Sequence, residues 1–187
     1  MATIGSFRIH QAVRALRAGG VIAYPTEGVW GLGCDPENAA AVLHLLELKR
    51  REMAKGLVLV AATIEQFAPH LAGLDAAQLQ RLRAGWPAAL TWLVPDNGAA
   101  AEWIRGASDR VALRVSPHPV VAALCRAFGG PLVSTSANPS GRPAAMSALR
   151  VRHYFGDSLD YIVAGKLGGR GAPTPIRDLL TGDYARG

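Results

Sequence analysis

The feature that most limits the fold of this chain is the alternation of short, mostly apolar segments with longer segments of helical periodicity. An apolar segment of four to eight residues without polar alternation is typical of a strand that is covered on both faces of its sheet. We therefore predict one α/β domain with about seven strands and helices between most of them. The predicted strands are residues 21–24 (VIAY), 57–62 (LVLVAA), 90–94 (LTWLV), 111–115 (VALRV), 131–135 (PLVST), 161–164 (YIVA) and 176–180 (IRDLL).

Turn-forming residues separate these segments. Residues 25–36 (PTEGVWGLGCDP) are interpreted as a loop, with Asp35 as the N-cap of the following helix and Pro36 at its first helical position. Residues 165–175 (GKLGGRGAPTP) form the most loop-like stretch, and we expect it to be mobile or to close over a ligand. No internal repeat or linker divides the chain, so residues 1–187 are predicted to be a single domain.

Composition excludes several classes of protein. Half of the 187 residues are hydrophobic and 18% are charged, which is typical of a globular protein and not of a disordered one. No apolar segment approaches the roughly 20 residues that cross a bilayer, and the first ten residues have no apolar signal core. We expect a soluble cytoplasmic protein without a membrane partner. Cys34 and Cys125 lie far apart in the sequence with no Cys/His cluster, so no metal site is predicted.

The charge points to an anionic ligand, because the formal net charge is +6 and the pI is about 9.9. No Walker A motif is present, since Gly165-Lys166 is followed by leucine, and neither G-x-S-x-G nor HExxH occurs. The five histidines are scattered. If the chain is an enzyme, it is expected to act by positioning and electrostatics and not through a nucleophile–base pair.

Polar residues gather next to four of the predicted strands. They are Thr26 and Glu27 after 21–24, the cations from Lys49 to Lys55 before 57–62, Arg114 within 111–115, and the residues from Ser134 to Asn138 at the end of 131–135. In open α/β sheets, ligands bind beyond the carboxyl ends of strands. Hydroxyl groups and cations there favour a pocket for an anionic ligand, most simply a nucleotide.

Each of these clusters also has a structural interpretation. Residues 134–138 could form only a turn, Arg114 could make an internal salt bridge, and Lys49 could be a solvated lysine at a helix end. The sequence by itself leaves these alternatives open.

Six motifs in order resemble the YrdC-like family, in particular its short bacterial form, over residues 8–187. They are YPTEGVWGLGCDP, LKRREMAKGLVLV, WPAALTWLVP, VALRVSPHPVV, PLVSTSANPSGRP and PTPIRDLLTGDYARG. Two segments depart from the family pattern: Trp86–Ala89 replaces W-P-G-P, and Pro173–Ile176 replaces P-S-x-I. The second departure leaves the contact of Thr174 with substrate open.

The resemblance implies a twisted, mostly mixed sheet with flanking helices and a basic concave pocket. It also implies that the chain joins L-threonine, bicarbonate and ATP into threonylcarbamoyl-adenylate and releases pyrophosphate. Partner proteins would then transfer the threonylcarbamoyl group to the adenosine next to the anticodon of certain tRNAs, and the basic surface could contact tRNA.

The resemblance further implies roles for particular residues, starting from the family's K-x-R…S-x-N tetrad, which is Lys49, Arg51, Ser136 and Asn138 here. Lys49 and Arg51 are expected to act on the ATP phosphates and the carbamate. The threonine would contact Thr26, Arg114 and Thr174, and the nucleotide would contact Ser134, Ser136, Asn138 and Arg186. Magnesium would accompany the triphosphate, with no carboxylate clearly dedicated to it, and the role of Lys55 stays open.

The competing interpretation is a double-stranded RNA or tRNA-binding factor without catalysis of its own. A basic concave face could bind RNA through its shape and phosphates. The sequence lacks the aromatic stacking motifs of RNA-recognition sheets, which favours the enzyme.

Overall fold

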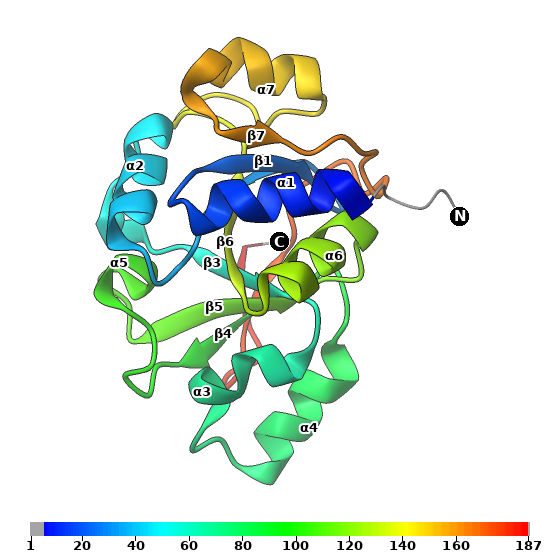
Figure 1. Cartoon of the computed structure of the whole chain (residues 1–187). Helices are drawn as coiled ribbons and strands as arrows, with labels where there is room; N and C mark the ends of the chain where they lie inside the picture. The colour runs from blue at the N-terminus through cyan, green and yellow to red at the C-terminus, as the bar shows by residue number, and fades with distance from the viewer. Residues whose placement is uncertain (1–5, 187) are drawn as a thin grey trace.

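The computed structural model describes residues 6–186, and its core is one nine-stranded sheet (Figure 1). The strand order is β7-β1-β2-β6-β3-β5-β4-β8-β9. The strands are β1 (Ile22–Pro25), β2 (Trp30–Gly33), β3 (Val58–Ala61), β4 (Thr91–Pro95), β5 (Arg110–Val115), β6 (Leu132–Ser136), β7 (Tyr161–Ile162), β8 (Ile176–Asp178) and β9 (Tyr184–Arg186).

The sheet is mixed. The pairs β1–β7, β3–β5 and β4–β8 are parallel, and the other neighbouring pairs are antiparallel. The α/β class and the mixed sheet implied by the family resemblance are therefore confirmed.

The interpretation of residues 25–36 as a loop is wrong, because they contain β2, which forms an antiparallel hairpin with β1. The strand was missed in the sequence because Gly31 and Gly33 have low intrinsic strand propensity. The structure supplies the reason for them. A Cβ atom at Gly33 would lie 2.4 Å from the Val133 carbonyl oxygen and 2.8 Å from the Tyr24 ring, so β2 needs glycine where Tyr24 packs across it.

Among residues 6–186, seven α-helices and three short 3₁₀-helices precede or connect the strands. The α-helices are α1 (Ser6–Arg17), α2 (Ala39–Lys49), α3 (Ala68–Leu71), α4 (Ala76–Gly85), α5 (Glu102–Arg105), α6 (Pro119–Phe128) and α7 (Ala148–Phe155), and the 3₁₀-helices are η1 (Met53–Lys55), η2 (Ile64–Phe67) and η3 (Gly156–Ser158). None of the helices in the described residues has the length and apolar character to cross a membrane.

The predicted N-cap at Asp35 is wrong. The N-cap of α2 is Asn38, whose side chain accepts a hydrogen bond from the Ala41 backbone N–H, while Asp35 accepts one from Glu37 within the preceding turn. Both residue types suit either role, and only the point at which the backbone becomes helical distinguishes them.

Helices α1 and α6 cover part of one face of the sheet (Figure 1). Val60 of β3 and Leu132 of β6 are buried beneath them, in one apolar cluster with α1 and α6. Residues two positions apart in a strand share a face, so Val58 and Ser134 lie on the same face further along. The opposite face packs Leu59, Leu113 and Val133 into the larger apolar cluster, which includes buried side chains of α2 and α5.

The prediction of a sheet covered on both faces is therefore wrong for part of the α1/α6 face. Beyond the two helices, a row of neighbouring positions continues across the sheet: Ser134 pairs with Val58, Val58 with Ala112, and Ala112 with Leu93. These four residues line a pocket.

Candidate functional site

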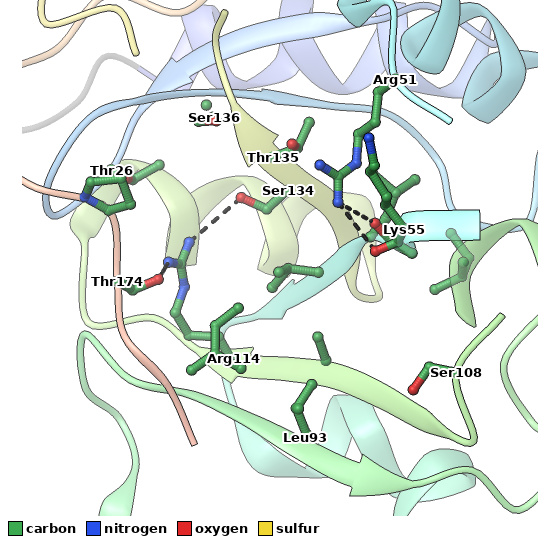
Figure 2. A pocket seen from close by; sticks show the side chains of 18 of the residues that line it. Thr26, Arg51, Lys55, Leu93, Ser108, Arg114, Ser134, Thr135, Ser136 and Thr174 are labelled. Carbon is green, nitrogen blue, oxygen red and sulfur yellow. Dashed lines mark hydrogen bonds between the residues drawn. The ribbon is translucent and has the colours of Figure 1, made fainter. Parts of the chain in front are cut away.

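The pocket on the α1/α6 face has a volume of about 250 Å³ and collects most of the predicted site residues (Figure 2). It lies over the sheet and not beyond one edge, because a mixed sheet has no common carboxyl edge. Its polar lining includes Thr26, Arg51, Lys55, Arg105, Ser108, Arg110, Arg114, Ser134, Thr135, Ser136 and Thr174. Arg105, Ser108 and Arg110 were not predicted from the sequence, whereas Thr135 belongs to the polar cluster that was predicted at the end of the strand 131–135.

Arg114 is the best-buried cation that lines the pocket, with 5% of its surface exposed. Its Nη1 donates to Thr174 Oγ1 at 2.7 Å, and its Nη2 donates to Ser134 Oγ at 3.5 Å (Figure 2). Its buried Nε has no hydrogen-bond partner among the described residues. The guanidinium is thus held by two hydroxyl groups and keeps donor capacity for an anionic ligand.

A protein carboxylate also faces this arginine, since Glu27 Oε2 lies 3.9 Å from Arg114 Nη2. The Ser116 hydroxyl donates to Glu27 Oε1 at 2.5 Å and itself accepts the His118 backbone N–H at 3.1 Å. The His118 ring Nε2 lies 3.0 Å from the Lys166 carbonyl, and burial lowers the pKa of that imidazole. This network, which fixes the buried Glu27 beside Arg114, was missed from the sequence, although the polar residues that follow β1 and β5 directly could have indicated it.

The segment 165–175 is tied to the turn after β1. Gly168 N–H donates to the Thr26 carbonyl and Arg170 N–H to the Glu27 carbonyl, both at 3.0 Å. Gly28 meets the segment so closely that a Cβ atom there would lie 1.8 Å from the Ala172 carbonyl oxygen. The Thr26 hydroxyl donates to the Val29 carbonyl at 2.8 Å within the same turn. The segment thus carries Thr174 to Arg114 by docking on residues 26–28.

Gly28→Ala is expected to displace this segment, because the clash is with backbone and cannot be relieved by a side-chain rotation. Trypsin should then cut at the exposed Lys166 and Arg170 much faster than in the wild type. Gly130→Ala is the matched control, because a Cβ atom at Gly130 would meet only a Phe128 ring atom, at 4.0 Å, among the described residues outside its immediate chain neighbours. Equal cleavage rates in both variants would show that the segment does not depend on this contact.

Arg51 and Lys55 form a second cationic edge of the pocket (Figure 2). Arg51 Nη2 donates to the carbonyls of Lys55 and Gly56 at 3.2 and 2.9 Å. Its buried Nε has no hydrogen-bond partner within the described ranges, and burial lowers the pKa of Arg51. Lys55 pairs with Glu52 at 3.6 Å and is 54% exposed. Lys55, whose role was left open, therefore lies at the pocket, and Arg51 and Ser136 of the tetrad do too.

Lys49 and Asn138, the other two members of the tetrad, do not line this pocket. Lys49 is 3% exposed, so its interpretation as a solvated lysine is wrong. Its Nζ donates to the carbonyls of Ser136 and Asn138, the latter at 2.8 Å, and its own carbonyl accepts from Ser140 N–H at 2.7 Å. Lys49 thus ties the end of α2 to the loop that carries Ser136. Its contact with phosphates stays a prediction.

The Asn138 side chain also shapes this loop. Its Nδ2 donates to the carbonyls of Arg142 at 2.6 Å and Pro139 at 3.1 Å, while its buried Oδ1 has no partner in the described part of the chain. Residues 136–142 are therefore more than a surface turn, because the buried Lys49 side chain and the half-buried Asn138 side chain hold them. The predicted nucleotide contact of Arg186 is untested: its backbone pairs with Ile176 in β9, and its side chain lies outside the described residues.

Burial, and then the nearby Arg51 charge, lower the pKa of Lys49 to about 7. The unfolded amine keeps its ordinary value of about 10.5, so between these two values unfolding takes up a proton. Stability should therefore rise with pH from about 7 upward through the Lys49 contribution. We expect Lys49→Met to flatten this rise, as measured by urea unfolding at pH 7.0, 7.75 and 8.5. Parallel pH profiles for the variant and the wild type would contradict the shifted pKa. Burial raises the pKa of Cys34 and Cys125 from the ordinary value of 9.0 to about 12. Ionisation of the unfolded thiols therefore begins to lower stability as the pH approaches 9, and it does so equally in both proteins.

No group of three or more His, Cys, Asp or Glu side chains that could hold a metal ion occurs among residues 6–186. Glu27 is already engaged by Ser116 and faces Arg114.

A family model covers residues 14–186 and is that of Sua5, YciO and YrdC, with the description "Telomere recombination". The chain belongs to the Sua5/YciO/YrdC family. Its relatives include a threonylcarbamoyl-AMP synthase of Cellvibrio japonicus, 55% identical over 96% of this chain and 95% of the relative. Another relative with the same name, from Stutzerimonas stutzeri, is 57% identical over 98% of each chain.

Solved structures of the family share the fold. Sua5 of P. abyssi in complex with L-threonine superposes with a TM-score of 0.88 at 28% identity, over 96% of this chain and 53% of that one. The H234A/Y235A variant of the same protein gives a TM-score of 0.91 at 28% identity, over 98% of this chain and 56% of that one. This chain therefore spans little more than half of Sua5. E. coli YciO, with a TM-score of 0.84 at 24% identity over 97% of this chain and 89% of its own, supports the fold alone.

Proposed function

We propose that this chain is a threonylcarbamoyl-AMP synthase, which condenses L-threonine, bicarbonate and ATP and releases pyrophosphate. The observation that carries the proposal is Arg114, a buried guanidinium with spare donor capacity in a pocket whose other edge is cationic. The names of relatives more than half identical over nearly their full length, and a family structure that binds L-threonine, support it.

The threonine end of the reaction belongs at Arg114. Its guanidinium would bind the substrate carboxylate, as arginine does in bidentate pairs. Thr174 and Ser134 hold the guanidinium in place, and Thr26 lines the same end of the pocket. With Glu27 fixed beside it, the arginine is preorganised before substrate enters.

The chemistry is adenylyl transfer. The threonine amine attacks carbon dioxide or bicarbonate and forms an N–C bond, with loss of a proton or of water, to give a carbamate. A carbamate oxygen then attacks the α-phosphorus of ATP, a P–O bond forms, and the bond to pyrophosphate breaks. Because the carbamate decomposes in water, the pocket must hold both partners close and exclude solvent.

The phosphates belong at the opposite edge, where Arg51 and Lys55 face Ser136 across the pocket. Cations there offset the charge that builds on the phosphates in the transition state. The volume of about 250 Å³ is below the 300–1,000 Å³ of typical small-molecule sites, so threonine fits inside while the nucleotide extends over the rim. Magnesium would enter as part of the magnesium–ATP substrate.

The product would serve the modification of tRNA next to the anticodon in the cytoplasm, through partner proteins that use the adenylate. The competing candidate is an RNA-binding factor without catalysis, which the basic charge favours but the enclosed arginine does not. RNA binding through phosphates falls steeply with salt concentration, whereas ATP binding in a pocket should change less.

The experiment that tests the function is a pyrophosphate-release assay in which threonine, bicarbonate and ATP are omitted in turn. We expect release only when all three are present. Release that does not depend on threonine, or none under any condition, would refute the synthase.

A further inference from the structure

A second basic surface lies on the outer side of the loop that carries Ser136. It is a groove of about 720 Å³ whose lining includes Arg50, Arg142, Met146, Arg150, His153 and Tyr154. We name it the arginine groove. No aspartate or glutamate lines it, and no proposed step of the synthesis uses its residues.

The charge of the whole chain is concentrated around this part of the sequence. Residues 110–156 contain six arginines and no acidic residue, so the remaining residues hold 14 basic and 14 acidic side chains. Two of these six arginines, Arg142 and Arg150, line the groove, whereas Arg110 and Arg114 line the other pocket. The positive charge of the groove favours an acidic partner.

Backbone geometry gives an independent indication at Arg50. This residue ends α2 in the left-handed conformation, with φ 50° and ψ 49°, and no other non-glycine residue among the described ones has a positive φ. Glycine or asparagine is usual at such a helix end, because the Cβ atom of other residues crowds the backbone in this conformation. The chain has an arginine instead, and its side chain lines the groove.

An apolar side chain also lies in the groove, because Met146 lines it and is 50% exposed. The Arg150 guanidinium lies 5.7 Å from the centroid of the Tyr154 ring, so one face of that ring is covered. Arginine, methionine and tyrosine with few acidic residues are the composition of protein–protein interfaces. A nucleic acid would find an exposed methionine against its phosphates and a partly covered aromatic ring for stacking.

We infer that the arginine groove is the docking surface for an acidic partner protein that takes up the adenylate. The inference rests on the proposed function, because a mixed carbamic–phosphoric anhydride is open to hydrolysis and is best consumed near its source. The partner would touch the outer side of the loop 136–142: Ser136 lines the pocket, while Pro139, Ser140 and Arg142 line the groove. Asn138 bonds the Arg142 carbonyl, which joins the two sides.

The test uses the double variant Arg142→Glu/Arg150→Glu. The Arg142 contact to Asn138 is made by its backbone carbonyl, so the loop should keep its shape. The control is Arg83→Glu/Arg126→Glu, which changes two exposed arginines of α4 and α6 by the same charge. Binding of the full-length chain is measured to two immobilised probes: the purified threonylcarbamoyl transferase of the same organism, and an unmodified tRNA transcript. Pyrophosphate release is measured in parallel without either probe.

We expect the groove variant to bind the transferase at least tenfold more weakly than the wild type does, at both low and high salt concentration. The affinity of the control variant should stay within twofold of the wild-type affinity. Pyrophosphate release and tRNA binding should match those of the control. If tRNA binding falls instead, the groove is an RNA surface; if neither binding changes, it is only a solvated surface, and either result overturns the proposal. If the wild type itself releases no pyrophosphate, the synthase function is refuted, and this result is distinguishable from the two binding results.

Discussion

Arg114→Ala is expected to raise the apparent KM for threonine by roughly 100-fold or more and to leave the KM for ATP nearly unchanged. Only threonine offers a carboxylate to the guanidinium, and removing one partner of a desolvated charge pair costs on the order of 3–5 kcal/mol. The measurement is steady-state pyrophosphate release with each substrate varied in turn. Equal effects on both substrates would refute the assignment.

The structural alternative for Arg114 now has a named partner, because Glu27 lies 3.9 Å away. Arg114→Ala leaves this buried carboxylate without its cation, so the variant should also unfold more easily. Combining it with Glu27→Gln separates the two roles. If Arg114 serves only a salt bridge, the double variant should regain both stability and turnover; if it binds threonine, stability alone should recover. Thr174→Val, which removes one hydroxyl that holds the guanidinium, should raise the threonine KM less than Arg114→Ala.

Lys49→Met is expected to reduce threonine- and bicarbonate-dependent pyrophosphate release by at least roughly 100-fold, the scale seen when one preorganised electrostatic contact is lost. The buried ammonium holds the carbonyls of Ser136 and Asn138, so its loss disturbs the loop that borders the pocket. It should also cost about 1–3 kcal/mol of stability, because a buried carbonyl loses its donor. Thermal melting and the pyrophosphate assay measure the two effects.

Two lysines serve as comparisons for Lys49. Lys166→Met removes an exposed lysine that lines neither the pocket nor the arginine groove and should leave turnover unchanged. Lys55→Met, at the rim of the pocket, should reduce turnover less than Lys49→Met because its ammonium is half exposed. Lys49→Arg should retain only part of the wild-type turnover, since a planar guanidinium does not replace a compact ammonium. Wild-type turnover in a folded Lys49→Met protein would remove Lys49 from the mechanism.

The sequence by itself determined the α/β class, the position of most strands and the family. Continuous apolar segments such as 57–62 and 131–135 report burial, which is a local property of each segment, so they located β3 and β6 correctly. β2 was missed because its glycines are required by Tyr24, a contact that periodicity does not record. The resemblance also named Arg114 and Thr174 as threonine contacts and Ser134 as a nucleotide contact, and the fold brings all three side chains together.

Only the tertiary structure decided how these residues face one another. Strand order and register depend on contacts between segments far apart in the sequence, and they placed Ser134, Val58, Ala112 and Leu93 in one row beyond the reach of α1 and α6. Two lysines six residues apart were separated in the same way: α2 ends in a left-handed turn at Arg50, which leaves Lys49 buried behind the loop and Lys55 at the pocket. Side-chain direction at such a turn depends on backbone dihedral angles and long-range packing, and neither can be read from the order of residues.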